Sequence, residues 1–303
     1  MSEKIRNVSA SVHQRLLNKA KESSRPFNEV LQHFAIERFI YRLSVSPHAD
    51  RFILKGALMF PVWSGPSSRS TLDIDLLGRI DNGLETIVAV MKDASSMDVE
   101  DDGMSFYAHT VTAHEITEDA DYNGVRVRLQ GTLGTARISL QIDIGFGDVI
   151  VPKPGKVTYP VILDLPAPKL NGYTMESGIA EKFQAMVKLG IANSRMKDFY
   201  DIWFLSRMFD FKGEVLGEAL MKTFENRNTP LTIDSAIFDP SFPGERVKKV
   251  QWLGFIRKAQ LTDPPEDFED VIATIRGFLE PLVATLAEKR SFTGTWSPSG
   301  PWR

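Results

Sequence analysis

The sequence predicts an α+β (mixed α/β) fold, with helices at the N-terminus, a mixed sheet after them and a helical C-terminal half. Apolar residues recur at helical spacing before residue 43 and again after residue 175. Between these stretches they alternate with polar residues, as in half-buried strands. The length of 303 residues favours two domains. We expect residues 1–168 to hold the N-terminal helices and the sheet, and residues 169–303 to be helical.

The composition is that of a globular protein and excludes several kinds of site. Charged residues make up 25% of the chain, hydrophobic residues 43%, and the net charge is −3. Because the chain has no cysteine, disulfides, a thiol nucleophile and thiolate metal ligands are excluded. No apolar run approaches the roughly 20 residues of a membrane helix, and the polar N-terminus lacks a signal-peptide core. We therefore expect a cytoplasmic protein with no membrane partner.

The N-terminal part is expected to begin with two helices within residues 8–43, separated by a break at Ser24-Arg25-Pro26. Residues 51–56 form a short apolar run that ends in glycine, which is typical of a buried strand or a strand-to-helix turn. Residues 63–70 contain many helix breakers and are expected to form a loop.

Residues 72–76 alternate apolar and acidic side chains and are expected to form a strand. On such a strand Asp73 and Asp75 point to the same side, roughly 6–7 Å apart. Like charges at this distance repel each other, and a divalent cation with oxygen ligands would relieve the repulsion. Taken alone, the pair favours a solvated strand face over a metal site, so its context decides the interpretation.

Further strands provide that context. After a helix at residues 82–92, strands are expected at residues 105–112, 125–129 and 136–144, and a proline-rich connector at 152–168. Asp143 lies on the polar side of the last of these strands. Three carboxylates from two strands, namely Asp73, Asp75 and Asp143, match the ligands of a metal-dependent phosphoryl-transfer site.

Candidate phosphate-binding groups surround this set. Lys55-Gly56 ends a strand where a helix is expected to start, and backbone N–H groups at such a point favour phosphate. Ser70 or Thr71 supplies a hydroxyl beside the carboxylates. Lys182, at the flank of an apolar helical stripe, can reach a triphosphate as a point charge. An ordinary turn and a solvated helix face are the alternatives for these groups.

The C-terminal half is expected to contain helices from residue 175 to residue 289 and to end in a loose tail at residues 291–301. Asp198 and Asp201 share one helix face, where Lys197 could instead pair with Asp201. Between residues 71 and 123 the chain has thirteen acidic and two basic residues, a charge that suits metal and repels a polynucleotide. Compensating basic clusters lie in two later segments, at Lys182, Lys188, Arg195 and Lys197, and at Arg246, Lys248, Lys249, Arg257 and Lys258 beside Trp252 and Phe255.

The order of these motifs resembles that of the nucleotidyltransferase-type AbiEii/AbiGii toxins, the group that includes the MenT toxins. The resemblance rests on residues 52–57, 69–76, 141–148, 181–186 and 195–201, and so covers nearly the whole chain. It implies a polymerase-β-like nucleotidyltransferase core, whose active site the helical C-terminal domain completes. It also implies a toxin of a toxin–antitoxin system, with a cognate antitoxin as partner, that transfers NMP from an NTP to the 3′ end of a tRNA and so blocks translation.

The resemblance also implies roles for residues. Asp73 and Asp75 would bind Mg²⁺, Lys182 would bind the triphosphate, Thr71 would supply the hydroxyl next to the first aspartate, and Asp198 would be the late catalytic aspartate, with Asp201 as the other candidate. Asp143 would complete the metal site or assist deprotonation. At Ala57 the sequence departs from the serine of many nucleotidyltransferases, so phosphate contacts at that position are expected from the backbone.

Two other classes of function remain open from the sequence. A kinase-like phosphotransferase or a metal nuclease would use the same carboxylates. A non-catalytic module would block a nucleic acid through its basic helices, which carry aromatic residues that can stack on bases.

Overall fold

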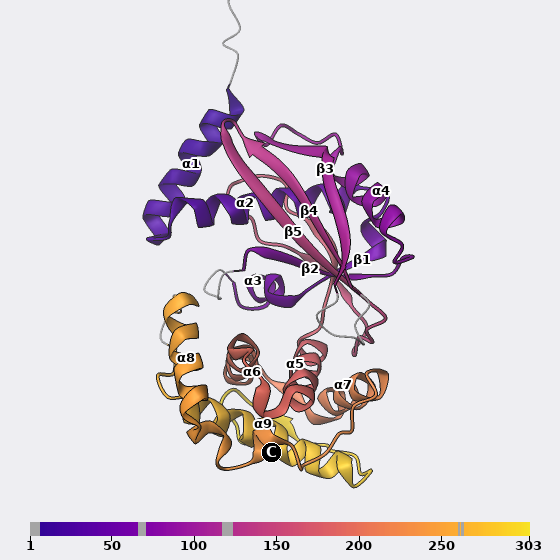
Figure 1. Cartoon of the computed structure of the whole chain (residues 1–303), viewed down its shortest axis with the longest axis vertical. Helices are drawn as coiled ribbons and strands as arrows, with labels where there is room; N and C mark the ends of the chain where they lie inside the picture. The colour runs from indigo at the N-terminus through magenta and orange to yellow at the C-terminus, as the bar shows by residue number, and fades with distance from the viewer. Residues whose placement is uncertain (1–6, 66–70, 117–123, 260, 262–263) are drawn as a thin grey trace, which may run out of the picture. The chain divides into compact units, whose positions relative to one another are not determined.

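The computed structural model describes residues 7–65, 71–116, 124–259, 261 and 264–303, which form two compact units (Figure 1). The first unit contains the described residues up to Gly147 together with Gly155–Gly172. The second contains Asp148–Pro154 and Tyr173–Arg303.

The first unit is built on a mixed sheet, which has seven strands within the described residues. Its order is β3-β4-β5-β2-β1-β7-β6, with parallel pairing of β2 to β5 and of β1 to β7, and antiparallel pairing elsewhere. The strand bounds are Phe52–Lys55 (β1), Asp73–Gly78 (β2), Met104–Ile116 (β3), Gly124–Leu133 (β4), Ala136–Phe146 (β5), Gly155–Thr158 (β6) and Lys169–Gly172 (β7). The predicted mixed α/β fold class is confirmed.

Helices cover the apolar face of this sheet. They are α1 (Val8–Ser23), α2 (Phe27–Val45) and α4 (Leu84–Ser95), while the short helix α3 (Phe60–Ser64) packs on the 3₁₀ helix that follows β1. Helix α2 packs against β5, and α4 packs against β3. The ring of Phe39 on α2 meets the ring of Phe106 on β3 edge-on, with centroids 5.6 Å apart. One face of the sheet is therefore part of the core, and polar residues occupy the other.

Both predicted N-terminal helices are confirmed, and so is the break between them. Helix α1 begins at Asn7, whose side chain accepts a hydrogen bond from the backbone N–H of Ala10. It ends at Ser24, which adopts a left-handed conformation with φ 55°. Pro26 then precedes α2 and has no N–H to continue the first helix.

The interpretation of residues 152–168 as a plain connector was wrong in part. Strand β6 lies within it, and β7 follows directly after its last proline. Strand β6 is at the edge of the sheet and pairs on one side only, so prolines before and after it interrupt no central ladder. The predicted loop at residues 63–70 starts later than expected, because Trp63 and Ser64 end helix α3; residues 66–70 lie outside the described residues.

The second unit is helical, as predicted. Its helices are α5 (Met175–Leu189), α6 (Met196–Met208), α7 (Gly213–Asn226), α8 (Arg246–Ala259) and α9 (Phe268–Ala287). A two-stranded ladder, β8 (Phe211–Lys212) with β9 (Thr295–Trp296), joins the C-terminal segment to the helices. No helix in the described part of the chain is long and apolar enough to cross a membrane.

The prediction of a loose tail at residues 291–301 was wrong. The indole of Trp296 is 3% exposed, and its Nε1–H donates to the carbonyl of Ser206 at 2.6 Å. Trp302 stacks on Phe278 of helix α9 with centroids 5.7 Å apart. Glycine, serine and proline predicted flexibility, but the two tryptophans bury enough apolar area to anchor the segment.

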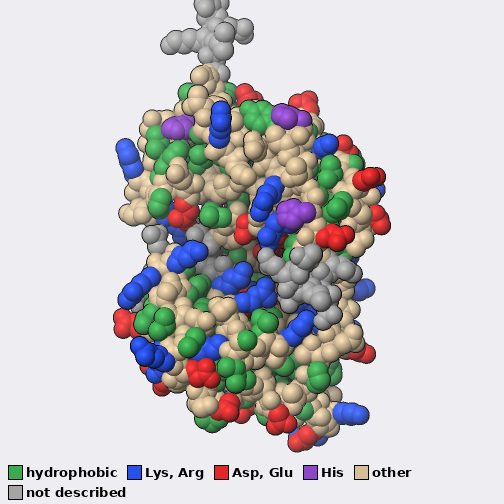
Figure 2. Space-filling model, viewed as in Figure 1, with side chains coloured by type: hydrophobic (Ala, Val, Ile, Leu, Met, Phe, Trp, Pro, Cys, Tyr) green, Lys and Arg blue, Asp and Glu red, His purple; other side chains and the backbone are tan. Residues whose placement is uncertain are grey.

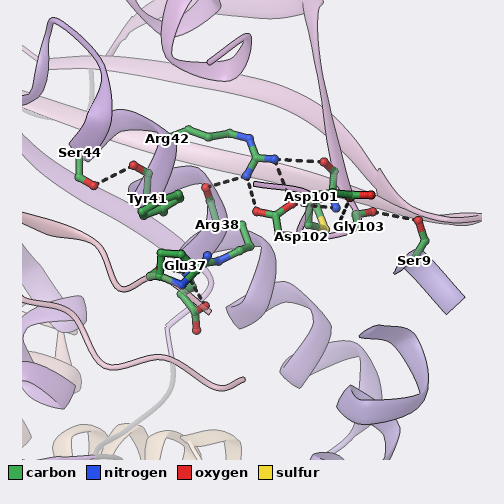
Figure 3. Close-up of polar contacts among 11 residues, drawn as sticks. Ser9, Glu37, Arg38, Tyr41, Arg42, Ser44, Asp101, Asp102 and Gly103 are labelled. Carbon is green, nitrogen blue, oxygen red and sulfur yellow. Dashed lines mark hydrogen bonds and ion pairs between the residues drawn. The ribbon is translucent and has the colours of Figure 1, made fainter. Parts of the chain in front are cut away.

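Buried ion pairs hold α2 against the segments around it (Figure 3). The guanidinium of Arg42 binds both carboxylate oxygens of Asp102, at 2.7 and 3.0 Å. It also donates to the carbonyl of Met104, at the start of β3. Asp102 belongs to the acidic stretch that dominates residues 71–123, so part of that negative charge is neutralised inside the protein.

A second buried pair joins α2 to the connector before β7. Arg38 and Glu37 lie 2.8 Å apart, and each side chain is 1% exposed. Arg38 donates to the carbonyl of Pro166, and Glu37 accepts the backbone N–H of Ile162. Burial outweighs the attraction of Arg38 and raises the pKa of Glu37 to about 7. The connector is thus fastened by a carboxyl group that titrates near neutral pH.

This pKa gives a testable pH dependence. Between about pH 4.5 and pH 7 the folded state holds a proton on Glu37 that the unfolded state has lost, so the stability of the wild type falls as the pH rises. A Glu37→Gln variant stays neutral. We expect its free energy of unfolding to gain up to about 3 kcal/mol relative to wild type across this window. Urea unfolding followed by circular dichroism at pH 5, 6, 7 and 8 measures the difference, and parallel pH profiles would contradict it.

Candidate active site

Asp73 and Asp75 lie on the polar face of the sheet. In β2, Ile74 and Leu76 are buried, whereas Asp73 is exposed and Asp75 is half-buried on the other side. The parallel pairing of β2 with β5 places Asp75 opposite Asp143 and Asp73 opposite Gln141. Because paired residues share a face and neighbouring strands are about 4.8 Å apart, the carboxylates of Asp75 and Asp143 belong to one acidic cluster.

Lys55 stands on the other side of this cluster. The antiparallel pairing of β1 with β2 puts Lys55 opposite Asp75, and the lysine side chain is 9% exposed. Three adjacent strands therefore carry Lys55, Asp75 and Asp143 in one row. A cation beside two carboxylates reduces their mutual repulsion.

Gly56 directly follows this lysine and approaches the same carboxylate. Its φ is +66°, in the left-handed region, and a Cβ built there would collide with the carboxylate of Asp75. The 3₁₀ helix Gly56–Met59 begins at this residue, and α3 follows directly. Glycine is required here twice, once for the backbone conformation and once for the space that Asp75 fills.

Arg126, which the sequence analysis missed, binds Asp143. Arg126 on β4 is paired with Asp143 on β5, and its Nε and Nη2 donate to the two carboxylate oxygens, each at 2.8 Å. The signal was the alternation of Val125, Arg126 and Val127, which already placed the arginine on the polar face. Its partner lies seventeen residues away on the next strand, and no local spacing indicates that register.

The ion pair of Arg126 with Asp143 affects which carboxylates could bind a metal ion. Among the described residues, no three His, Cys, Asp or Glu side chains form a group that could hold one. Asp143 already accepts two charge-assisted hydrogen bonds from Arg126. Asp73 and Asp75 supply the carboxylate oxygens that Mg²⁺ prefers, and Mg²⁺ often takes only one or two carboxylates besides substrate phosphates. The residues present fit Mg²⁺ through this pair.

Of the two predicted hydroxyl residues, the structure describes Thr71 but not Ser70. The Thr71 hydroxyl lies 3.4 Å from both the backbone nitrogen and the carbonyl oxygen of Asp73, at the entrance to β2. Ser70 lies outside the described residues.

Lys182 and Asp198 belong to the second unit, where they form a group with Asp201. The Nζ of Lys182 on α5 lies 3.1 Å from Asp198 and 2.8 Å from Asp201, both on α6. Asp201 is fully buried, and Asp198 is nearly so. The guanidinium of Arg195 lies 3.9 Å from Asp198. Asp201 is therefore paired with Lys182, and the alternative pairing with Lys197 is not observed.

A second ion network surrounds the residue before Lys182. Arg227, after α7, donates to Asp148 at 2.7 Å and lies 3.4 Å from Glu181. The hydroxyl of Tyr173 donates to the same glutamate. This network ties the Asp148–Pro154 segment to helices α5 and α7, and it positions the helix that carries Lys182.

The basic helix α8 offers less charge at the surface than its sequence indicates. The ammonium group of Lys248 is buried and donates to the carbonyls of Ile191 and Asn193, each at 2.6 Å. Trp252 is fully buried, and its indole donates to the carbonyl of Pro265. Lys248 and Trp252 therefore stabilise the second unit rather than offering a surface for nucleic acid.

Comparison with known proteins identifies the fold in which this site occurs. A family profile described as "Nucleotidyl transferase AbiEii toxin, Type IV TA system" matches residues 38–274. The structure of JHP933 from Helicobacter pylori is similar, with a TM-score of 0.50, 14% identity, and coverage of 86% of this chain and 94% of that chain. A second H. pylori structure, described as a candidate nucleotidyltransferase, has a TM-score of 0.49, 13% identity, and coverage of 86% and 97%. No curated protein sequence matches the chain.

Replacing Gly56 by alanine should destabilise the protein through both backbone strain and a collision with Asp75. Gly147 also has a positive φ of +81°, but nothing lies within 4 Å of a Cβ built there, so Gly147→Ala measures the backbone strain without a collision. We expect Gly147→Ala to lose about 1–2 kcal/mol of unfolding free energy through backbone strain alone. Gly56→Ala should lose at least about 1 kcal/mol more, because Asp75 must move. Equal losses for the two variants in urea unfolding would exclude the predicted collision.

The ion pairs of Lys182 with Asp198 and Asp201 also predict an effect on stability. Lys182→Met removes the ammonium group that pairs with two buried carboxylates, which should lower the free energy of unfolding by about 3 kcal/mol. Adding Asp201→Asn should recover much of the loss, because it removes one of those charges. Lys197→Met is the matched control, since Lys197 is exposed on the same helix as Asp201. Four of the five tryptophans lie in this unit, so urea unfolding followed by tryptophan fluorescence reports on it. A loss for Lys182→Met no larger than that of the control would refute the account.

Proposed function

The chain belongs to the AbiEii nucleotidyl transferase toxin family of type IV toxin–antitoxin systems, and we propose that it transfers NMP from an NTP to an RNA acceptor, the 3′ end of tRNA. Such a transfer would block translation by changing the end that must carry the amino acid. We propose the MenT-like group as its nearest functional type, and the cytoplasm, where NTPs and tRNA are available, as its location.

The observation that carries this proposal is the acidic cluster of Asp73, Asp75 and Asp143 on the sheet of a nucleotidyltransferase. Asp73 and Asp75 face the same side of β2, with Asp143 opposite Asp75. The family match includes all three residues. Phosphoryl transfer depends mainly on positioning and on compensation of the negative charge of the phosphates, and carboxylates that bind a divalent cation serve both purposes.

On this proposal Asp73 and Asp75 hold Mg²⁺. When bound, the ion would neutralise charge on the triphosphate and polarise its α-phosphate. Lys55 and the backbone around Gly56 bind phosphate oxygens, and the Thr71 hydroxyl orients the first aspartate or the nucleotide. Arg126 holds the Asp143 carboxylate by two hydrogen bonds, which fixes its direction.

The reaction forms one P–O bond, breaks another and transfers one proton. The 3′-hydroxyl oxygen of the RNA attacks the α-phosphorus in line, the bond from that phosphorus to the bridging oxygen breaks, and pyrophosphate leaves. The hydroxyl proton passes to a carboxylate, for which Asp143 and Asp198 are the candidates. The family resemblance gives Lys182 the role of binding the triphosphate. Its two carboxylate partners, Asp198 and Asp201, position its ammonium group.

The proposal predicts a specific loss of activity. Asp73→Ala or Asp75→Ala removes a metal ligand, and transfer should fall at least about a hundredfold. The assay incubates purified full-length protein with Mg²⁺, total tRNA and each α-³²P-labelled NTP in turn. Asp98→Ala is the matched control, because Asp98 is an exposed aspartate of the same unit outside the sheet. A folded Asp73→Ala protein with undiminished transfer would refute the site.

The same assay separates the alternative functions. Label that reaches RNA from the γ-position instead of the α-position indicates a phosphotransferase. Shortening of RNA without any NTP indicates a nuclease. Growth inhibition that persists after Asp73→Ala and Asp75→Ala indicates a module that acts by occupying its target.

The family implies an antitoxin partner and a nucleotide substrate. The identity of the NTP follows from which labelled nucleotide is transferred. Co-expression with a candidate antitoxin, followed by purification, tests whether the antitoxin binds the toxin directly.

A further inference from the structure

The polar face of the sheet continues beyond the acidic cluster into an arginine-containing surface. Strand pairing arranges it in rows that run across β3, β4 and β5. The row of the acidic cluster contains His114, Arg126 and Asp143. The next rows contain Thr112, Arg128 and Gln141, then Tyr107, Gln130 and Ser139, and finally Ser105, Thr132 and Arg137.

This surface, which we call the arginine face, consists of the last three rows together with His114. Most of its side chains are exposed, including those of Arg128 and Arg137. Its rows lie wholly in the described part of the chain, and none of them contains an acidic residue. Figure 2 shows Lys or Arg side chains and a His side chain grouped over these strands. The helices of the unit pack on the opposite, apolar face.

The arginine face lies next to the acidic cluster and on the same side of the sheet. Arg128 is opposite Gln141, which in turn is opposite Asp73, so two strand spacings of about 4.8 Å separate Arg128 from the acidic pair. Arg137 lies four residues further along β5, about 14 Å from the row of Arg128. Positive charge thus extends away from the carboxylates over several rows.

We propose that the arginine face binds the phosphate backbone of the RNA acceptor and directs its 3′ end to the acidic cluster. Arg128 and Arg137 are the phosphate-binding residues. Tyr107 supplies a base-stacking surface, because its hydroxyl is held 2.9 Å from the Thr132 hydroxyl and its ring is more than one-third exposed. This inference rests on the proposed nucleotidyl transfer and specifies which surface holds the acceptor.

Charge and chemistry favour RNA as the occupant. A polyanion is attracted to a surface with arginines and no acids, whereas the acidic cluster at its border repels phosphates unless a cation is bound. The uncharged members of the rows are hydroxyl and amide side chains, which donate to phosphate and to the ribose 2′-hydroxyl. Aliphatic side chains are absent from these described rows, and Tyr107 is their one aromatic side chain, whereas the buried centre of a protein interface is more apolar.

The test measures RNA binding without catalysis. Fluorescein-labelled total tRNA is titrated with the full-length protein, and anisotropy is recorded at several salt concentrations. The Arg128→Ala/Arg137→Ala double variant should bind about fivefold more weakly than wild type. The slope of log affinity against log salt should decrease by about 1.5, since two phosphate contacts are lost. Arg128→Lys/Arg137→Lys should retain most of the affinity, because a lysine also provides the charge.

Arg15→Ala is the matched control, since Arg15 is exposed on α1, which belongs to the helices behind the sheet. The proposal is overturned if the double variant has the same affinity and salt slope as this control while its melting temperature is unchanged. It is also overturned if the lysine variant is as weak as the alanine variant, because that result indicates a structural role.

The assay also separates this proposal from the function on which it rests. If wild type binds tRNA through Arg128 and Arg137 but transfers no label from any NTP, the arginine face stands and the proposed transfer fails. If wild type transfers label and the double variant does so with unchanged KM for tRNA, the transfer stands and the arginine face is refuted. A raised KM with unchanged kcat supports both.

Discussion

The register between β2 and β5 is the constraint on which the rest of the first unit depends. It places Asp75 opposite Asp143, so two negative charges share one row of the sheet. The neighbouring strands place a cation at each side of that row, Lys55 on β1 and Arg126 on β4. A slip of one residue would turn the carboxylates into the apolar core and bring isoleucines to the surface. Packing of the apolar face against the helices therefore fixes the acidic cluster.

In the second unit, repulsion between neighbouring carboxylates is likewise reduced by a cation, here on helices instead of strands. Two carboxylates one turn apart on α6 share a single ammonium group from α5, and one of them is fully buried. Each unit thus holds aspartates together by setting cations between or beside them. Burying such groups costs free energy, and the function proposed above, binding of a triphosphate, gives a physical reason for retaining them.

Much of the fold was predictable because its periodicity is local. The alternation around Asp73 and Asp75 gave strand β2, and the apolar spacing gave the helices of both units. Strands β6 and β7 have four residues each, too few for a pattern to stand out among prolines. The anchoring of the C-terminal segment was missed because composition predicted flexibility there, while the buried Trp296 and the half-buried Trp302 decide its position.

The candidate site was predictable in its residue types but not in its pairings. Asp143 was recognisable from the polar side of its strand, yet its bond to Arg126 depends on a register that only the folded sheet reveals. For the same reason the negative charge of residues 71–123 gave a misleading view of the surface. Asp102 from that stretch is buried with Arg42, and strands β4 and β5 bring arginines beside the carboxylates that remain.

The proposed chemistry depends on binding of a divalent cation by Asp73 and Asp75 together. Titration of Mn²⁺, a spectroscopic substitute for Mg²⁺, into the full-length protein measures this directly, because electron paramagnetic resonance quantifies the free ion. We expect wild type and Asp98→Asn to bind Mn²⁺ alike, and Asp73→Asn/Asp75→Asn to bind it at least about tenfold more weakly. Equal Mn²⁺ affinity in the folded double variant and in wild type would exclude this pair as the metal site.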